Sequence, residues 1–306
     1  MAFDTHCHLD FIHQKLEAIE NENPHNERLV FNNFRELKEK FSSEFTDFRG
    51  CITNFCDPGL FMNNNYEEMF KYDLDVWYTF GVHPHFADQL DSSVFCALKN
   101  ALKLPKVVAL GEMGLDYKKT KCSKEMQKNA FRVQLRLALS LKLPIVLHIR
   151  NADEDGLEIM AEENIPTDHP IHLHCFTGLI YLVPIILKRI KIFSLGCWTD
   201  CQSWMKRYTR LKVGFTIVEG LTDVVKNIPL DKILLETDAP YFFKGTRGHG
   251  FAHPGHVQYV AHKVAELKKV SYNDVINANF KNVKEVYNFT ELQVVSEKIK
   301  VMDMDF

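Results

Sequence analysis

The chain opens with two histidines whose spacing can supply half of a metal site. The apolar run Ala-Phe-Asp-Thr predicts a short strand, and His6 and His8 follow at its end in an i, i+2 relation. Side chains alternate along a strand, so both imidazoles point to one side while Cys7 points to the other. Imidazole is a common ligand of divalent transition metals. A lone His-x-His pair can also be two polar residues of a core, so the rest of the chain must decide.

Later apolar runs end on four more residues of metal-ligand type, each after a stretch typical of a buried parallel strand. They are Glu112, His148, His174 and Asp238. With the first pair they make four histidines and two carboxylates, which is more than one tetrahedral ion needs. The set predicts two divalent ions that share a carboxylate and a water. Imidazole-rich ligation suits Zn²⁺, whereas mixed carboxylate ligation also accepts Mg²⁺ or Mn²⁺.

These residues need a scaffold that brings the ends of separate strands together. Apolar runs of strand length alternate along the chain with amphipathic stretches of helix length. Strands are predicted at residues 2–6, 50–54, 76–81, 107–112, 145–148, 171–174, 192–195 and 233–236, and helices include 92–102 and 124–141. This alternation predicts an α/β fold, a (β/α)8 TIM barrel with eight parallel strands and an outer ring of helices. Functional side chains of such a barrel gather at the C-terminal ends of its strands.

The length of 306 residues suits one barrel domain, predicted at residues 1–289, with a mobile C-terminal tail at 290–306. Two stretches are longer than a connecting loop needs. We predict insertions at about residues 14–49 and 198–215, the first as a surface excursion with its own helix.

Composition and charge are those of an ordinary soluble protein, with 46% hydrophobic residues, 25% charged residues and a net charge of −3. The eight cysteines form no Cys-x-x-Cys pair, which suits a reducing compartment. No apolar run approaches the roughly 20 residues that a membrane span needs. We therefore expect a monomer of the cytoplasm or nucleus that does not bind membranes.

Six motifs, in this order, resemble those of the TatD family of metal-dependent nucleases, within the amidohydrolase-like superfamily. They are Phe-Asp-Thr-His6-Cys-His8-Leu-Asp10, Gly81-Val-His83-Pro-His85, Gly111-Glu112-Met-Gly-Leu-Asp-Tyr, Leu-His148-Ile-Arg150, His174-Cys-Phe-Thr-Gly178 and Glu-Thr-Asp238-Ala-Pro-Tyr241. The resemblance extends from residue 3 to about residue 288, and it is similar in detail to animal TatD domain-containing proteins. It implies that His6, His8, Glu112 and Asp238 hold one ion, and that Glu112, His148 and His174 hold the other.

The resemblance also implies a divalent-metal-dependent phosphodiester hydrolase, a deoxyribonuclease or exonuclease that could also act on RNA. Two cations that share a water lower its pKa and favour hydroxide as the nucleophile. We expect Asp238 to take or orient the proton of that water, and Glu112 to bridge the two ions.

Two further residues have a functional and a structural interpretation. His83 would contact substrate phosphate by the family resemblance, or it could be a capping histidine beside Pro84. Arg150 could clamp a phosphate, or it could anchor Glu112 or Asp238 from behind.

The loops that follow the fourth and eighth strands carry basic and aromatic residues. Lysines at this rim could track substrate phosphates or be solvated surface: Lys118, Lys119 and Lys121. Aromatic residues could stack on unpaired bases or pack their own loops: Tyr117, Tyr241 and Phe242. The predicted partner is therefore nucleic acid, with single-stranded ends preferred. Cys7 and Cys175 adjoin ligands and are expected to point away as small core residues.

Two other functions are compatible with this sequence. One is a different amidohydrolase-type hydrolase acting on a lactone, cyclic amide or phosphotriester. Many of those enzymes bridge their metals with a carbamylated lysine where Glu112 stands here, which favours the TatD type. The other is a catalytically silent nucleic-acid-binding domain, which the complete ligand set disfavours.

Overall fold

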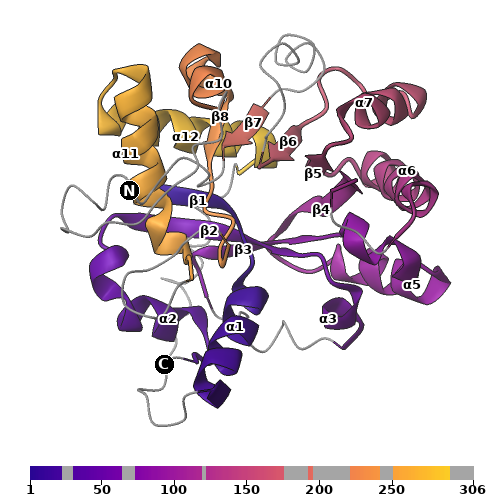
Figure 1. Cartoon of the computed structure of the whole chain (residues 1–306), viewed down its shortest axis with the longest axis horizontal. Coiled ribbons are helices and arrows are strands. Elements are labelled where there is room, and N and C mark those ends of the chain that lie inside the picture. The colour runs from indigo at the N-terminus through magenta and orange to yellow at the C-terminus, as the bar shows by residue number, and fades with distance from the viewer. Residues whose placement is uncertain are drawn as a thin grey trace, which may run out of the picture.

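The structure is a computed structural model that describes residues 1–22, 30–63, 73–118, 122–175, 192–195, 221–241 and 251–289. Within these ranges eight parallel strands form one sheet whose strand order follows the chain, with helices around its outside (Figure 1). The strands are β1 (Ala2–Cys7), β2 (Phe48–Phe55), β3 (Val76–Phe80), β4 (Val107–Asp116), β5 (Ile145–Arg150), β6 (Ile171–His174), β7 (Ile192–Leu195) and β8 (Ile233–Leu235). The predicted parallel α/β fold is confirmed.

Helices lie between strands along the chain, and η5, α11 and α12 follow the last strand. The α-helices are α1 (Leu9–Glu22), α2 (Phe34–Lys40), α3 (Pro58–Asn63), α5 (Ser92–Ala101), α6 (Lys124–Leu141), α7 (Asp153–Glu162), α10 (Leu221–Asn227), α11 (Val257–Lys268) and α12 (Tyr272–Tyr287). The short 3-10 helices are η1 (Ser42–Glu44), η2 (Pro84–Gln89), η4 (Leu230–Lys232) and η5 (Pro254–His256). The bounds of α6 match the prediction, because Ser123 caps its start by accepting a hydrogen bond from the Met126 amide.

The first strand lies beside the segment that follows the last one. The His8 amide donates to the Ala239 carbonyl at 2.7 Å, and the Asp238 amide donates to the His6 carbonyl at 2.9 Å. Earlier in both segments, the Thr5 hydroxyl donates to the Leu235 carbonyl at 2.9 Å. The ends of β1 and β8 therefore meet, which a closed barrel requires, although the closed eight-stranded barrel itself stays a prediction.

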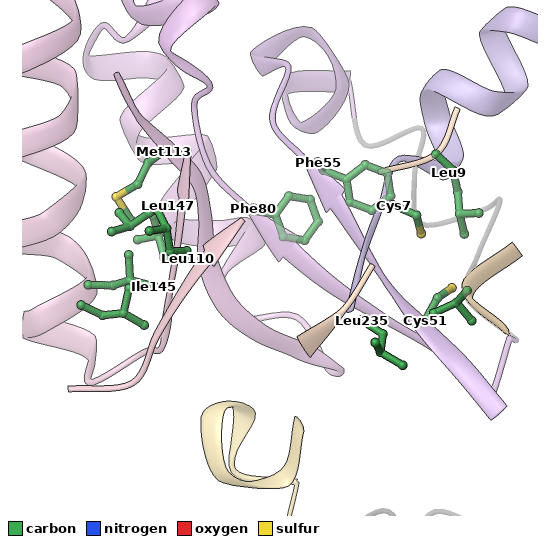
Figure 2. Close-up of a cluster of buried hydrophobic side chains, with 14 of the residues drawn as sticks. Cys7, Leu9, Cys51, Phe55, Phe80, Leu110, Met113, Ile145, Leu147 and Leu235 are labelled. Carbon is green, nitrogen blue, oxygen red and sulfur yellow. The ribbon is translucent and has the colours of Figure 1, made fainter. Parts of the chain in front are cut away.

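Strands β1 to β5 and β8 contribute to two hydrophobic clusters because their side chains alternate between the two faces of the sheet. One cluster packs beneath the helices, and Figure 2 shows members of it from β1, β2, β3, β4, β5 and β8. The other contains Phe3, Ile52, Trp77 and Val146 together with residues of α12 and Phe289. Burial on both faces explains why the strands are almost continuously apolar in sequence.

The segment predicted as a surface excursion after the first strand differs from that prediction. It contains two α-helices, because α1 begins at Leu9 directly after β1 and α2 follows. Phe31, Phe34 and Leu37 are fully buried in the main cluster. The aromatic and aliphatic residues spaced through this polar stretch therefore pack the segment onto the hydrophobic core. The insertion predicted at 198–215 and the tail at 290–306 lie outside the described residues.

A search of the described helices found none with the length and apolar character needed to cross a membrane.

Candidate metal centre

The two histidines of the first strand converge as their spacing predicts. Their Nε2 atoms lie 3.2 Å apart, and both side chains are almost fully buried. Cys7 points the other way, where its thiol donates to the Ile52 carbonyl. Two imidazole nitrogens that face each other at this distance can both direct lone pairs to one point, which is the geometry of two ligands on one ion.

Two glycines of β4 allow this strand to approach its neighbour closely around Glu112. Gly111 and Gly114 have φ values of 152° and 142°, and a Cβ at Gly114 would stand 2.0 Å from the His148 carbonyl oxygen. Only glycine fits a backbone with this conformation and this contact. The β4–β5 register also shifts between Leu110 and Met113. These features place the Glu112 side chain beside the end of β5.

Glu112 stands at the centre of the cluster, with its two carboxylate oxygens facing different groups. Oε2 lies 3.6 Å from Nε2 of both His6 and His8. Oε1 lies 2.8 Å from Nδ1 of His148 and 3.2 Å from Nε2 of His174. A carboxylate placed in this way has the geometry of a bridge between two ion positions.

Asp238 completes the set from the segment after β8. Its Oδ1 lies 3.5 Å from Nε2 of His8 and 3.8 Å from Nε2 of His6. Its φ of 51° is in the left-handed region, where its amide is held by the His6 carbonyl. The structure thus brings together all six residues that the sequence selected as metal ligands.

Hydrogen bonds behind three of the histidines select which ring nitrogen faces the centre. His8 donates from Nδ1 to the Asn54 carbonyl at 2.9 Å, and His174 donates from Nδ1 to Glu236 at 3.2 Å. Both therefore present an Nε2 lone pair inward. His148 is turned the other way, because its Nε2 faces Asp116 Oδ2 at 3.3 Å and its Nδ1 faces Glu112.

Burial and neighbouring charges shift the pKa values of the central groups strongly. Burial disfavours the charged form of Glu112, yet the surrounding histidines outweigh it and hold the pKa of its carboxyl well below the usual range. Burial lowers the pKa of His6 to about 4. Burial opposes the charged form of His8 too, but its hydrogen bond to Asp238 and the charge of Glu112 raise its pKa to about 9. A divalent ion binds anionic carboxylates and neutral imidazoles, so an ion bound here would displace the proton that these carboxylates favour on His8.

The donor set also fits divalent metal ions by its chemistry. Subsets of the cluster place three ligand atoms within 4.8 Å of one another, including His6–His8–Asp238 and His6–Glu112–His174. Imidazole nitrogens and carboxylate oxygens together suit zinc, manganese and magnesium. A cavity opens over the cluster and is lined by His8, Phe11, Cys56, His83, His85, Phe86, Glu112, Asp116, His148, Ile149, Arg150, His174, Cys175, Asp238 and Tyr241.

Comparison with known proteins identifies the family. The sequence model described as TatD related DNase matches residues 3–288, which is nearly the whole chain. The chain belongs to the TatD family. It is 38% identical over 294 residues to the human protein named 3'-5' RNA nuclease TATDN2, covering 93% of this chain and 35% of the human one. The chain thus spans about a third of that relative's length.

Two other TatD-family comparisons cover whole proteins. The chain is 31% identical over 291 residues to a Bacillus subtilis protein named uncharacterized metal-dependent hydrolase YabD, covering 94% of this chain and 99% of that one. The crystal structure of YJJV, a TatD homolog from Escherichia coli, superposes with a TM-score of 0.68 at 20% identity, covering 94% of this chain and 98% of that one. The last comparison supports the fold alone.

Three polar residues behind the ligands of this TatD-family site were not selected from the sequence: Asp116, His172 and Glu236. Asp116 contacts His148 and His85, with Nε2 of His85 at 3.0 Å, and Glu236 contacts His174 and His172. The i, i+2 spacing that selected the first histidine pair also relates Glu236 to Asp238 and His172 to His174. The same spacing could therefore have indicated His172 and Glu236 from the sequence.

Arg150 lines the cavity and pairs with a carboxylate that the sequence did not indicate. Its guanidinium lies 3.7 Å from Asp116 Oδ2, and it lines the cavity. It is therefore paired with Asp116, whereas the expected structural partners were Glu112 or Asp238. The charge of Arg150 stays close to the centre in a half-exposed position, where a phosphate can reach it.

His83 presents a donor to the centre. Its Nδ1 accepts a hydrogen bond from the His85 amide at 3.1 Å, so a neutral His83 carries its proton on Nε2. That Nε2 lies 3.8 Å from Glu112 Oε1. Burial lowers the pKa of His83 well below its usual range, which keeps the ring neutral.

The remaining predicted substrate residues differ in their exposure and contacts. Tyr241 lines the cavity with 46% of its surface exposed, and Lys118 is exposed at the end of β4. The hydroxyl of Tyr117 donates to Asp155, while the Lys124 ammonium lies 4.3 Å from the centre of the Tyr117 ring. Lys119, Lys121 and Phe242 lie outside the described residues.

Cys175 does not point into the core as expected. It is half-buried, lines the cavity and has a φ of 48°. This left-handed backbone breaks the side-chain alternation of β6, on which the prediction depended.

Proposed function

We propose that this chain is a divalent-metal-dependent phosphodiester hydrolase that cleaves nucleic acid strands with water. The observation that carries the proposal is the position of Glu112, whose two oxygens face two separate groups of imidazoles. The names of the human and Bacillus relatives, an RNA nuclease and a metal-dependent hydrolase, support the same chemistry.

The proposed ligand sets follow the two sides of Glu112. His6, His8 and Asp238 lie on its Oε2 side and would hold one ion with it, and His148 and His174 lie on its Oε1 side and would hold a second. Two bound divalent ions, Mg²⁺, Mn²⁺ or Zn²⁺, would supply Lewis acidity to the attacking water and to the phosphate.

The side chains around the ions have distinct proposed roles. Asp238 accepts or orients the proton of the attacking water, because its carboxylate is at the cavity and close to both histidines of β1. His83 donates from Nε2 to a phosphate oxygen, and Arg150 adds positive charge beside it.

Contacts beyond the cleaved phosphate are proposed for the rim. Lys118, Lys119 and Lys121 would follow neighbouring phosphates. Tyr241, Phe242 and Tyr117 would contact bases of a single-stranded end. We also propose a single domain at residues 1–289, a closed (β/α)8 barrel and a monomeric protein. The contact between β1 and the segment after β8 supports the closed barrel.

The proposal is tested with dye-labelled single-stranded DNA and RNA, with and without a chelator, together with measurement of bound metal. The Glu112→Ala protein should lose most bound metal and nearly all turnover while its circular dichroism stays that of the wild type. Glu163→Ala is the matched control. Glu163 is a carboxylate whose side chain is largely shielded from solvent, and it pairs with Arg136 at 2.7 Å outside the centre. Wild-type turnover in the Glu112→Ala protein would refute the bridging role.

A further inference from the structure

Phe11 is an aromatic residue of the cavity wall to which no role has been given above. It lies in the first turn of α1, three residues after His8, and its side chain is only partly buried. It lines the same cavity as Glu112 and Asp238. A ligand that covers the exposed part of this ring removes apolar surface from water, which favours binding.

Two neighbouring rings hold Phe11 in a defined orientation. The Phe11 ring stacks on His8, with centroids 5.0 Å apart and planes at 25°. Tyr241 meets it edge-on, with centroids 6.4 Å apart and planes at 71°. Tyr241 also meets His8 edge-on at 6.0 Å. We call these three rings, His8, Phe11 and Tyr241, the aromatic corner.

Packing of α1 fixes where Phe11 stands in the aromatic corner. The Ile12 amide donates to the His8 carbonyl at 3.0 Å, which starts the helix at the ligand strand. Ile12 and Leu16 are fully buried and fix the opposite face of α1 in the core. The backbone of Phe11 is therefore fixed beside the cavity.

A stacking residue in this place would act on the nucleotide next to the cleaved bond. His8 is a proposed ligand of one of the two ions, and the Phe11 ring stacks on the His8 ring at the same cavity. A flat apolar ring of this kind binds an unpaired nucleobase by stacking, whatever its sequence, because every base has a π face. A base within a duplex is stacked and paired with its neighbours, so it must leave the duplex before it can occupy the corner.

We propose that Phe11 is a base-stacking residue, and that the aromatic corner is the subsite for the unpaired base adjacent to the cleaved phosphodiester. The inference rests on the proposed nuclease function and adds a specificity-determining residue to it. The recognised ligand is an unpaired base of DNA or RNA, and the cost of separating it from a duplex explains a preference for single-stranded ends.

The test compares two strands in each protein, one with all bases present and one with an abasic site at the nucleotide next to the cleaved bond. Wild-type protein should cleave the intact strand with the higher kcat/KM. In Phe11→Leu the ratio of the two values should fall at least about fivefold, the low end expected for a lost base–aromatic stack. Phe11→Tyr keeps an aromatic ring and should keep the wild-type ratio.

The control variant is Phe95→Leu, which removes a half-buried phenylalanine of α5 outside the cavity. It should leave the ratio at the wild-type value. An equal loss of kcat/KM on both strands in Phe11→Leu would overturn the inference, since it would mean that Phe11 only packs against His8.

Failure of the proposed function gives a different result. If the wild-type protein cleaves neither strand, the nuclease proposal falls while binding still tests the subsite. Equilibrium binding of labelled strands with a phosphorothioate at the terminal linkage should then show the same Phe11-dependent preference for the intact strand. Equal binding of the intact and abasic strands by the wild-type protein would overturn the inference.

Discussion

Glu236 Oε2 lies 3.2 Å from Nδ1 of His174, and this contact fixes which nitrogen of the imidazole faces Glu112. Both side chains are buried, and the second oxygen of Glu236 accepts a hydrogen bond from the Cys175 amide at 2.8 Å. Although burial favours a protonated carboxyl, the charge of His174 and the hydrogen bonds from His172 and His174 hold the pKa of Glu236 well below its usual range. An anionic carboxylate behind a histidine fixes its tautomer and makes it a stronger ligand.

The first prediction removes the charge of Glu236 without changing its size. In Glu236→Gln the affinity for the ion held by His174 should fall about 10- to 100-fold, the range typical of lost partners behind metal ligands. Metal titration against a competing chelator measures this directly. Asp73→Asn is the control, because Asp73 is a buried carboxylate far from the cavity that accepts from the Phe34 amide. Equal metal affinity in Glu236→Gln and the wild type would show that the contact has no influence on ligation.

The second prediction separates chemistry from binding at Asp238. Asp238→Asn keeps the size of the side chain and some ligating ability but cannot accept a proton. We expect kcat to fall at least about a hundredfold, the low end for loss of a general base. Affinity for a single-stranded oligonucleotide, measured by fluorescence anisotropy, should change little. The exposed Asp231→Asn in η4 controls for the loss of one negative charge near β8. A large rise in KM with kcat intact would assign Asp238 to substrate binding instead.

The fold and the convergence of the six central residues could be predicted because they depend on local patterns. Continuous apolar runs mark buried parallel strands, and the runs of β1, β4, β5 and β6 end on or next to a ligand-type residue at the same edge of the sheet. Strand order alone does not place Glu112 near His6, because β2 and β3 lie between β1 and β4. Their side chains meet because the sheet curves, as the predicted barrel requires.

The residues behind the ligands could not be predicted in the same way. Whether Arg150 pairs with Asp116 or with Glu112 depends on the β4–β5 register, which shifts at the glycines of β4. The extra length of β4 beyond Glu112 carries Asp116 into contact with His148. Pairings set by a bulge and by a left-handed residue are properties of the folded backbone, and sequence spacing does not report them.

The third prediction concerns a second buried histidine cluster, which joins η1 to η5. Nε2 of His253 lies 3.2 Å from Glu44 Oε2, and His256 also contacts that oxygen. Burial lowers the pKa of His253 from 6.5 to about 3. The unfolded chain therefore takes up a proton as the pH falls below about 6.5 while folded His253 does not, so stability is lost in that direction.

The variant His253→Phe keeps the ring that stacks on Phe45 but cannot titrate. Between about pH 7 and pH 5 the wild type should lose on the order of 2 kcal/mol more stability than this variant. Thermal unfolding followed by circular dichroism at several pH values measures the difference. His13→Phe, outside the cluster, should keep the wild-type pH dependence. Parallel Tm–pH curves for the wild type and His253→Phe would contradict the prediction.

The last prediction concerns how a chain with a net charge of −3 would hold a polyanion. The proposed ions neutralise only the cleaved phosphate, so neighbouring phosphates need other partners, and Lys118 stands exposed at the end of β4 beside the cavity residue Asp116. Each phosphate contact releases counterions and steepens the fall of affinity with salt by about 0.7 log units per log unit for single strands. Replacing Lys118, Lys119 and Lys121 together with Gln should therefore weaken binding and flatten that slope by up to about two units.

The slope is measured by anisotropy titrations of a single-stranded oligonucleotide over a series of salt concentrations. Turnover at saturating strand concentration should stay near that of the wild type, because these lysines contact the ground state and the transition state alike. Replacing Lys263, Lys268 and Lys269 of the α11 region with Gln removes the same charge away from the cavity and controls for net charge. If both triple variants flatten the slope equally, the rim lysines act only through net charge, and the phosphate track must be sought around Lys206, Arg207 and Arg210.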